Sequence, residues 1–203
     1  MAPTTKELLL KEAEQLVRTR GFAGFSYADL SERVGIQKAS IHHHFPTKEA
    51  LGCVLIDSYL IKFEEALQNT LDGDPRAGQR LTSYTEFFIE SMRDGMLPFC
   101  GALSAEMSIL PKSMQERVRY FFELHLKWLE RVVRDGIEAG EVRQDVDVHS
   151  TVMLILSTLE GASLVAWATQ DTGAIESATK QVFSSLGLAT SPSSPTTTMS
   201  KVA

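Results

Sequence analysis

Hydrophobic residues recur at three- and four-residue intervals along most of this 203-residue chain, and the strict alternation typical of strands is absent from the sequence. The first such stretch follows Thr4, which forms the pattern of a capping box with Glu7 three residues later. Its apolar positions from Leu9 to Leu16 fall on one helical face. We expect Gly21 to end this helix, because glycine is common directly after a helix C-terminus.

Two short helices joined by a tight turn are expected next. Ser26 and Asp29 predict the start of the first, because a side-chain oxygen satisfies free backbone N–H groups and an acid suits the first turn. Gly35 is expected to form the corner, since a residue without Cβ can adopt a positive φ. Residues 38–44 form the second helix. Phe45-Pro46 ends it, because the residue before a proline is pushed away from helical angles.

The same spacing predicts six further helices, separated by glycine- and proline-containing turns. They run from Thr47 to about Leu71, through Leu81 and Met92, over residues 102–110, from Met114 to about Gly140, from Asp147 to Gln170, and from Gly173 to Leu186. Residues 189–203 are rich in Ser, Thr and Pro and poor in apolar side chains, which predicts a disordered tail. The predicted fold class is all-α.

Composition narrows the classes of protein to consider. The chain is 43% hydrophobic and 23% charged, which is ordinary for a globular protein. Its net charge of −6 does not by itself favour nucleic-acid binding, although residues 1–50 carry seven Lys or Arg against six Asp or Glu. Because no apolar run approaches a membrane span and no signal peptide is evident, we expect a cytoplasmic protein without a membrane partner.

The second short helix carries a polar face that suits DNA. A helix-turn-helix places such a face in the major groove, where Gln, Lys and Ser contact base edges or phosphates. Lys48 begins the following helix, beside free N–H groups that attract a phosphate. The candidate DNA contacts are Gln37, Lys38, Ser40, His42, His43 and Lys48. The alternative is a solvated polar face with no ligand.

The stretch GFAGFSYADLSERVGIQKASIHHHFPTKEAL resembles the DNA-binding signature of the TetR family of transcriptional regulators. The matching features are Gly21-Phe22, Ser26, Asp29-Leu30, Gly35-Ile36, Lys38 to Ile41, His44 to Pro46, and Lys48 to Leu51. The resemblance implies an N-terminal three-helix domain of the helix-turn-helix type, residues 1–50, and a helical bundle for ligand binding and dimerisation, residues 51–188. It further implies a homodimer that represses by occupying double-stranded operator DNA.

One position departs from this family pattern. Family members usually carry Tyr where this chain has His42, and that Tyr typically contacts a DNA phosphate. A contact from His42 would therefore depend on the charge of the imidazole.

The sequence does not support a metal site or an enzyme. The three consecutive histidines at 42–44 point about a third of a turn apart on a helix, so they cannot converge on one ion. Glycine-rich phosphate loops, nucleophile elbows and His–Glu metal motifs are absent from the sequence. We expect no cofactor and no catalytic activity. A second hypothesis is a helical small-molecule enzyme or carrier that shares only the small domain.

The helix predicted from Asp147 to Gln170 is apolar on almost every side, and such a helix must be covered on most of its faces. Small residues between Gly161 and Ala166 suit close approach of another helix. A homodimer that pairs the last two helices of each subunit would provide the cover, as the family resemblance also implies. The alternative is a central core helix in a monomer.

The segment around Cys100 is a candidate for effector sensing. Cys100 lies at a predicted helix start, where free N–H groups favour a reactive thiolate. Similar segments occur in family members that respond to electrophiles or oxidants, so the resemblance implies a reactive effector. The alternative is a buried apolar residue, the usual environment of a free cysteine, and Cys53 is expected to be structural. A small-molecule effector would instead bind in a pocket of the C-terminal bundle. The candidate residues for the walls of this pocket are Tyr84, Phe88, Phe99, Phe121, His125 and Trp128. The alternative for each of them is an ordinary packing role in the core.

Overall fold

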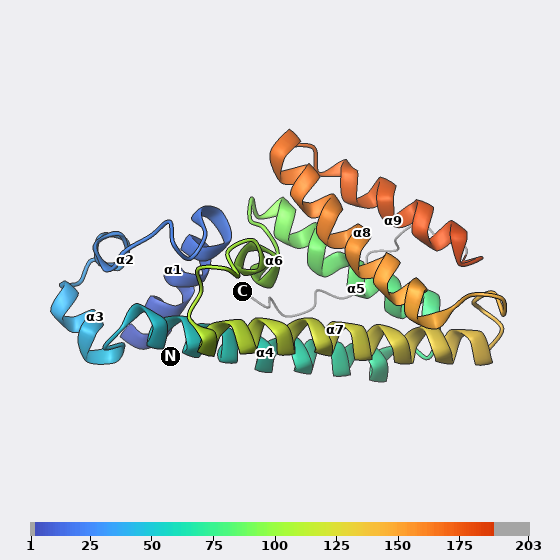
Figure 1. The fold of residues 1–203 in the computed structure, drawn as a ribbon, viewed down its shortest axis with the longest axis horizontal. Coiled ribbons are helices and arrows are strands. Elements are labelled where there is room, and N and C mark those ends of the chain that lie inside the picture. The colour runs from blue at the N-terminus through green and yellow to red at the C-terminus, as the bar shows by residue number, and fades with distance from the viewer. Residues whose placement is uncertain (1–2, 189–203) are drawn as a thin grey trace. The chain divides into compact units, whose positions relative to one another are not determined.

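The computed structural model describes residues 3–188, and every regular element in that range is an α-helix (Figure 1). The helices are α1 (Thr5–Arg20), α2 (Tyr27–Val34), α3 (Lys38–His44), α4 (Lys48–Gly73), α5 (Ala77–Arg93), α6 (Phe99–Ser104), α7 (Lys112–Glu138), α8 (Val148–Thr169) and α9 (Gly173–Ser185). The predicted all-α fold is confirmed. The predicted tail at 189–203 lies outside the described residues.

Most helices begin where the local sequence predicts. Thr4 and Glu7 form the capping box of α1, in which the Glu7 carboxylate accepts a hydrogen bond from the Thr4 amide at 2.7 Å. Ser26 and Asp29 do the same for α2, with the Ser26 amide donating to Asp29 at 2.8 Å. Asp147 caps α8 through its side chain. Each of these caps stabilises its helix by about 1 kcal/mol.

Helix α6 differs from its predicted position. The sequence pattern placed a helix over residues 102–110, whereas α6 begins at Phe99 and ends at Ser104. The helix buries Phe99 and Leu103, so its bounds are set by tertiary packing. After Ser104 the chain leaves the helical path through a series of turns, and Glu106 in this segment accepts hydrogen bonds from a distant part of the chain.

The described helices group into two compact units. The first contains the residues up to Ile61 together with Phe99–Phe121, and the second contains Lys62–Pro98 together with the residues from Phe122 onward. Helices α4 and α7 therefore contribute residues to both units. The sequence predicted a DNA-binding domain up to residue 50 and a ligand-binding and dimerisation domain after it. The two compact units do not test this functional division, and it stays a prediction.

The core of the first unit explains how two very short helices remain folded. Helix α1 supplies Leu9 and Leu16, α2 supplies Leu30, α3 supplies Ile41, and α4 supplies Leu51, all fully buried. Burying each of these side chains contributes roughly 1.5–3 kcal/mol. Helices α2 and α3 have too few backbone hydrogen bonds to be stable alone, so this shared core holds them in place.

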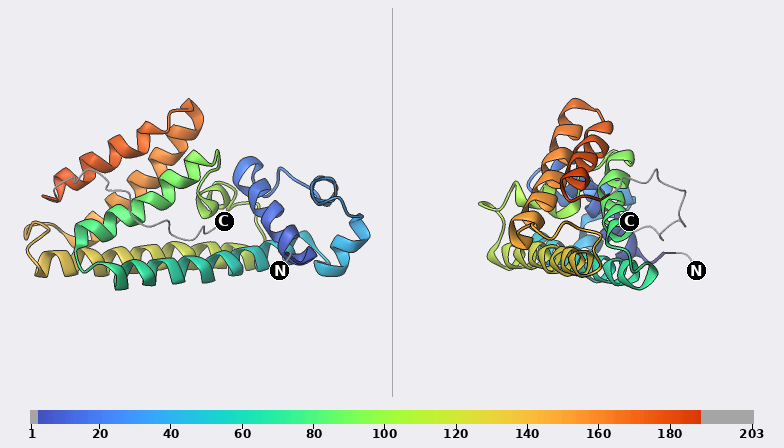
Figure 2. Two further views of the ribbon diagram at one scale, coloured as in Figure 1. Left: turned by 180° about the vertical axis from the view of Figure 1, so that it is seen from behind. Right: turned by 90° about the vertical axis from the view of Figure 1, so that its right-hand side faces the viewer.

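The second unit is built around α5, α8 and α9, together with the later parts of α4 and α7. Helices α8 and α9 lie side by side in both views of Figure 2. Ile155 and Leu159 of α8 are buried in this unit, as are Ile175 and Phe183 of α9. Trp128 of α7 also belongs to this core, where its indole N–H donates to the carbonyl of Leu67 at 3.1 Å.

Helix α8 is only half covered by its own chain. Met153, Leu154, Leu164 and Val165 are between 41% and 54% exposed on this helix. The prediction that one chain does not cover α8 on all sides is confirmed for the described residues. By length and composition alone α8 would also suit a membrane span, a criterion that the core helices of other proteins meet as well.

Candidate nucleic-acid interface and effector region

The turn between α2 and α3 has the geometry of a helix-turn-helix. Gly35 ends α2 with φ of 73°, in the left-handed region that favours glycine. Its amide donates to the Ser31 carbonyl at 2.9 Å, and the Ser31 hydroxyl donates to the Ile36 carbonyl at 2.5 Å. The turn is therefore fixed by bonds from α2 itself, as the sequence predicted for Gly35.

Helix α3 buries Ile41 fully and His44 in part, and presents its other residues to solvent. Ile41 is fully buried and anchors the helix. The exposed polar residues are Gln37, Lys38, Ser40, His42 and His43, which are five of the six predicted DNA contacts. Among the described residues, the side chains of Gln37, Lys38 and Ser40 have no intramolecular hydrogen bond, so their donors and acceptors are available to a ligand.

His42 is exposed but held by its neighbours. Its ring packs edge-to-face on Tyr27, with 4.9 Å between ring centroids, and its Nδ1 lies 3.2 Å from the Pro46 carbonyl oxygen. The hydroxyl of Tyr27 donates to the Phe45 carbonyl at 2.9 Å. Because Nδ1 must carry a proton to donate to Pro46, the neutral ring leaves Nε2 as an acceptor. Only the protonated imidazole can donate from Nε2 to a phosphate.

Lys48 differs from the other predicted contacts because its ammonium group lies within the first unit. Nζ donates to the carbonyls of Phe22 and Phe25, and lies over both rings at 4.5 Å and 4.2 Å from their centroids. Burial lowers the pKa of Lys48, while the charges of Glu106 and Asp29 act in the opposite direction. In this structure Lys48 therefore holds the loop between α1 and α2, and its phosphate contact stays a prediction.

Glu106 also binds the loop between α1 and α2, a role that the sequence did not reveal. Its carboxylate accepts hydrogen bonds from the amides of Phe22 at 2.6 Å and Ala23 at 3.2 Å. Gly21 has φ of 80°, and a Cβ there would lie 2.6 Å from Glu106 Oε1, so only glycine fits. The loop thus has its amides bound by Glu106 and two of its carbonyls bound by Lys48.

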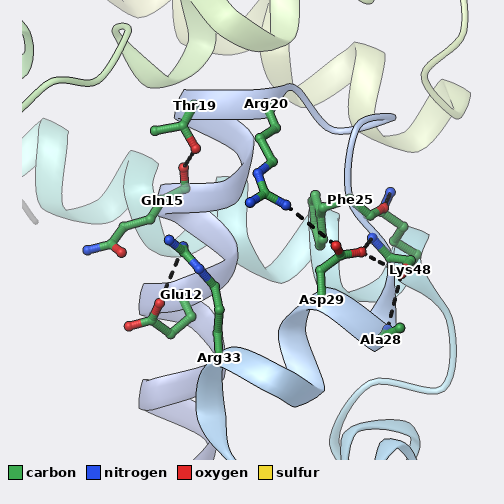
Figure 3. Close-up of polar contacts among 10 residues, drawn as sticks. Glu12, Gln15, Thr19, Arg20, Phe25, Ala28, Asp29, Arg33 and Lys48 are labelled. Carbon is green, nitrogen blue, oxygen red and sulfur yellow. Dashed lines mark hydrogen bonds and ion pairs between the residues drawn. The ribbon is translucent and has the colours of Figure 1, made fainter.

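Two ion pairs connect α1 to α2 (Figure 3). Arg20 pairs with Asp29 at 3.5 Å, and Arg33 pairs with Glu12 at 3.4 Å. Both pairs are partly exposed to solvent at the surface, so each contributes no more than about 1 kcal/mol. The orientation of α2 is therefore set mainly by the buried core and by the hydrogen bonds of Lys48 to the loop before α2. Figure 3 shows Lys48 beside Phe25.

The six residues predicted to line an effector site are divided between the two compact units. In the second unit, Tyr84 stacks on Trp128 at 5.1 Å between centroids and lies edge-to-face with Phe88 at 5.5 Å. His125 joins this cluster through a hydrogen bond between its Nδ1 and the Tyr84 hydroxyl. The remaining two predicted residues, Phe99 and Phe121, belong to the first unit, where both contact Tyr59. The structure brings four of the six predicted wall residues together.

Burial dominates the electrostatics of the cluster around Tyr84 and His125. It lowers the pKa of His125 to about 3, so the imidazole is neutral at physiological pH. The pKa of Tyr84 is raised well above its usual value by burial and further by the negative charge of Glu160. Phe63 of α4 stacks on the His125 ring at 4.5 Å between centroids.

Glu160 is a second residue that sequence reasoning missed. It is half-buried on α8, and burial raises its pKa to about 7. The available signal was its position as the only carboxyl group in a helix that is otherwise almost entirely apolar. Such a residue, close enough to Tyr84 to influence its pKa, is a candidate functional group.

The two cysteines have different environments. Cys100 lies in the first turn of α6 with 1% of its surface exposed, while Cys53 of α4 is half-buried with its thiol 3.5 Å from the Ser113 hydroxyl. Burial limits attack on Cys100 in this structure and agrees with a packing role. Its predicted sensing role stays a prediction.

Two cavities in the second unit are lined by residues other than Tyr84 and His125. The larger has a volume of about 140 Å³ and is lined by Met92, Gly95, Ala166, Trp167, Gln170 and Thr172. The smaller lies among α5, α8 and α9.

Comparisons with known proteins agree with this arrangement. Residues 9–51 match the family model described as bacterial regulatory proteins, tetR family, and residues 77–182 match the tetracyclin repressor-like C-terminal domain. The second match alone covers half of the chain. The repressor DhaR of Mycobacterium sp. strain GP1 is 25% identical over 160 residues, which is 78% of this chain and 80% of DhaR. The repressor NemR of Escherichia coli K12 is 29% identical over 115 residues, 55% of this chain and 58% of NemR.

Solved structures extend the similarity to the whole fold. A TetR-family transcriptional regulator from Agrobacterium tumefaciens superposes with a TM-score of 0.85 at 29% identity, covering 89% of this chain and 96% of that one. The reduced form of Escherichia coli NemR has a TM-score of 0.79 at 22% identity, with 93% and 100% covered, and shows the fold alone. With both of its parts matched in sequence and in structure, the chain belongs to the TetR family of helix-turn-helix transcriptional regulators.

Proposed function

We propose that the protein is a ligand-responsive repressor that occupies operator DNA as a homodimer. The observation that carries the proposal is the exposed face of α3, where Gln37, Lys38 and Ser40 are available for DNA on a helix anchored by Ile41. The relatives DhaR and NemR are named as repressors. The alternative of a helical enzyme or carrier is not favoured, because both parts of the chain match regulators. A regulator of this kind acts on chromosomal DNA in the cytoplasm.

Gln37 and Lys38 stand at the N-terminal end of α3, the part of a recognition helix that reaches base edges. They are the proposed specificity residues, because Gln pairs with adenine and Lys with guanine in the major groove. Ser40, His42 and His43 follow on the same short helix and are proposed to contact phosphates or bases.

The proposed homodimer uses the uncovered face of α8. Leu154, Leu164 and Val165 are about half exposed there. Exposure of several apolar side chains to water on one helix face is unfavourable and marks a protein-protein contact. Pairing this face with its copy across a two-fold axis buries the apolar residues and gives two recognition helices related by the same axis. Such a dimer requires an operator with two half-sites about 34 Å apart or a multiple of that distance.

The effector is proposed to act in the C-terminal bundle, through either a small molecule or a reactive compound. Displacement of bundle helices would alter the separation of the two recognition helices and lower operator affinity. Within the first unit, the contacts of Glu106 with Phe22 and of Lys48 with Phe25 are proposed to carry that displacement to α2 and α3.

The test is binding of the purified chain to DNA from upstream of its own gene, followed by fluorescence anisotropy and footprinting. We expect a footprint with dyad symmetry and a particle of twice the chain mass by light scattering. Gln37→Ala or Lys38→Ala should weaken binding by about 1–3 kcal/mol and change the preferred bases. Lys62→Ala, on an exposed site of α4, is the matched control and should have little effect.

Dimerisation is tested separately with Leu164→Glu, which places a charge on the uncovered face of α8. We expect this variant to be monomeric and to bind the operator weakly. Ile109→Glu is the control, because Ile109 is also exposed but belongs to the first unit. A stable wild-type monomer without a footprint would contradict the proposal.

A further inference from the structure

The larger cavity of the second unit lies where two helices end. Met92 lies in the last turn of α5 and Gly95 follows that helix, while Trp167 lies in the last turn of α8 and Gln170 caps it. All lining residues of the cavity belong to the second unit. A cavity of about 150 Å³ binds benzene, so the volume of about 140 Å³ suits one aromatic ring.

The lining of this cavity combines apolar residues with two polar side chains. Met92 and Ala166 are 6% and 1% exposed, and Trp167 is the aromatic residue of the lining. Gln170 and Thr172 provide the polar groups. Within the described residues no charged side chain lines the cavity, so an ionised ligand would lose water without gaining an ion pair. The cavity therefore suits a neutral ligand with an aromatic body.

Gln170 and Thr172 retain hydrogen-bonding capacity for a ligand. The Gln170 amide donates from Nε2 to the Trp167 carbonyl at 2.6 Å, which fixes the side chain at the end of α8. Within residues 3–188, Gln170 Oε1 and the Thr172 hydroxyl have no intramolecular hydrogen bond, and Thr172 precedes α9 without capping it through its side chain. A ligand hydroxyl matches this pair, because it can donate to the first group and accept from the second.

The two helix ends favour a donor over an anion. Helix α5 ends at Arg93 and α8 ends at Thr169, and the free carbonyls of each helix end carry a charge equivalent to about −0.5. Arg93 is already paired with Glu86 at 3.7 Å and with Glu176 at 3.5 Å. The cavity therefore disfavours a carboxylate and favours a group that donates a hydrogen bond.

We propose that this cavity is the effector site and that the effector is a neutral compound with a single aromatic ring and a hydroxyl group. The ring packs against Met92 and Trp167, and the hydroxyl donates to Gln170 Oε1. This inference rests on the proposed ligand-responsive function and specifies the site and the chemical class of the ligand.

The chain itself connects this cavity to the loop before the helix-turn-helix. Gly95 is followed, after residues 96–98, by α6, and Glu106 beyond α6 binds the amides of Phe22 and Ala23. A Cβ at Gly95 would meet nothing within 4 Å, so packing does not fix the chain at this residue. A ligand that holds the ends of α5 and α8 together therefore favours one position of α6 over others.

The first experiment compares phenol, anisole and benzoate by calorimetric titration of the full chain without DNA, at millimolar concentrations. Phenol can donate a hydrogen bond, anisole cannot, and benzoate carries a negative charge. Phenol should bind about tenfold more tightly than anisole, which is the effect of one hydrogen bond, and benzoate should bind most weakly.

Gln170→Met keeps the length of the side chain and removes its acceptor oxygen, so it should abolish the preference for phenol over anisole. Gln144→Met is the matched control. Gln144 is also exposed and also donates from Nε2 to a helix carbonyl, that of Ile137 at 2.6 Å, but it lines neither cavity. This variant should bind phenol as the wild-type chain does.

The two tryptophans of the chain report where the ligand binds. In protein that contains fluorotryptophan, Trp128 and Trp167 each give a fluorine NMR resonance, and Trp167→Phe assigns them. Phenol should shift the resonance of Trp167 and leave that of Trp128 unchanged. A shift of Trp128 alone would place the ligand in the aromatic cluster around Tyr84 and overturn the inference.

No binding of phenol, equal affinity for phenol and anisole, or an unchanged preference in Gln170→Met would also overturn the inference. The operator measurement is kept separate, and saturating phenol should lower the operator affinity of the wild-type chain by about tenfold. Operator affinity that phenol leaves unchanged would overturn the effector role of the cavity. Phenol binding at Trp167 in a chain that binds no operator would support the site and the ligand class and contradict the repressor function.

Discussion

The Glu106 carboxylate accepts a hydrogen bond from the backbone amide of Phe22 at 2.6 Å, across 84 positions of sequence. This bond joins the segment after α6 to the loop that precedes the helix-turn-helix. Both residues lie in the first compact unit, so the bond is internal to that unit. Movement of α6 would therefore act directly on the loop that positions α2.

Glu106→Gln is expected to weaken this connection. The amide keeps the shape of the side chain but removes its negative charge and one of its two acceptor oxygens, so the hydrogen bonds from the amides of Phe22 and Ala23 become weaker or fewer. We expect the free energy of unfolding to fall by about 1–3 kcal/mol and operator affinity to fall with it. Urea unfolding and anisotropy measure the two effects. Glu123→Gln, exposed on α7, is the control, and equal behaviour of the two variants would contradict the role of Glu106.

Lys48→Met separates two roles for this residue. The substitution keeps most of the apolar stem and removes the ammonium group, which bonds to the carbonyls of Phe22 and Phe25. We expect a loss of about 1–3 kcal/mol in the free energy of unfolding and an unchanged dependence of operator affinity on salt. A salt slope reduced by about one, with no loss of stability, would show instead that Lys48 contacts a phosphate.

His42→Phe should weaken operator binding, because it removes the ring nitrogen Nε2 that faces the DNA in the proposed complex and keeps an aromatic ring against Tyr27. Fluorescence anisotropy at constant ionic strength measures the effect. Wild-type affinity in His42→Phe would assign His42 a packing role on Tyr27.

His125 and Glu160 should make the free energy of unfolding depend on pH in opposite directions, because burial lowers the pKa of His125 and raises that of Glu160. His125 has a pKa of about 3 in the folded chain, so its contribution is fully present above the unfolded pKa near 6.5 and is lost as the pH falls toward 3. Glu160, with a folded pKa of about 7, contributes stability below 4.5 that is lost as the pH rises through 7. His125→Asn should flatten the acid side and Glu160→Gln the neutral side in urea titrations from pH 4 to 8.

Thiol labelling should distinguish the two cysteines. N-ethylmaleimide should modify the half-buried Cys53 faster than Cys100 in the folded chain, and both should react equally in urea, because Cys100 is 1% exposed. Cys100→Ser should keep operator binding. An electrophile that releases the operator only from chains with Cys100 would identify this residue as the sensor.

The sequence by itself determined the features that depend on near neighbours. The capping box of Thr4 and Glu7, the left-handed corner at Gly35 and the end of α3 before Pro46 involve residues within a few positions of one another. Their geometry follows from backbone sterics and local hydrogen bonds, which do not require the rest of the fold. The exposed face of α3 was predicted for the same reason.

Only the tertiary structure decided which distant groups meet. It placed α6 at Phe99–Ser104, directed the ammonium group of Lys48 into the loop before α2, and packed Phe99 against Tyr59 in the first unit. Such pairings depend on how helices pack across tens of residues of sequence. A long side chain with several rotamers takes the partner that the packed fold provides, so the partners of Lys48 and Glu106 could not be predicted from periodicity.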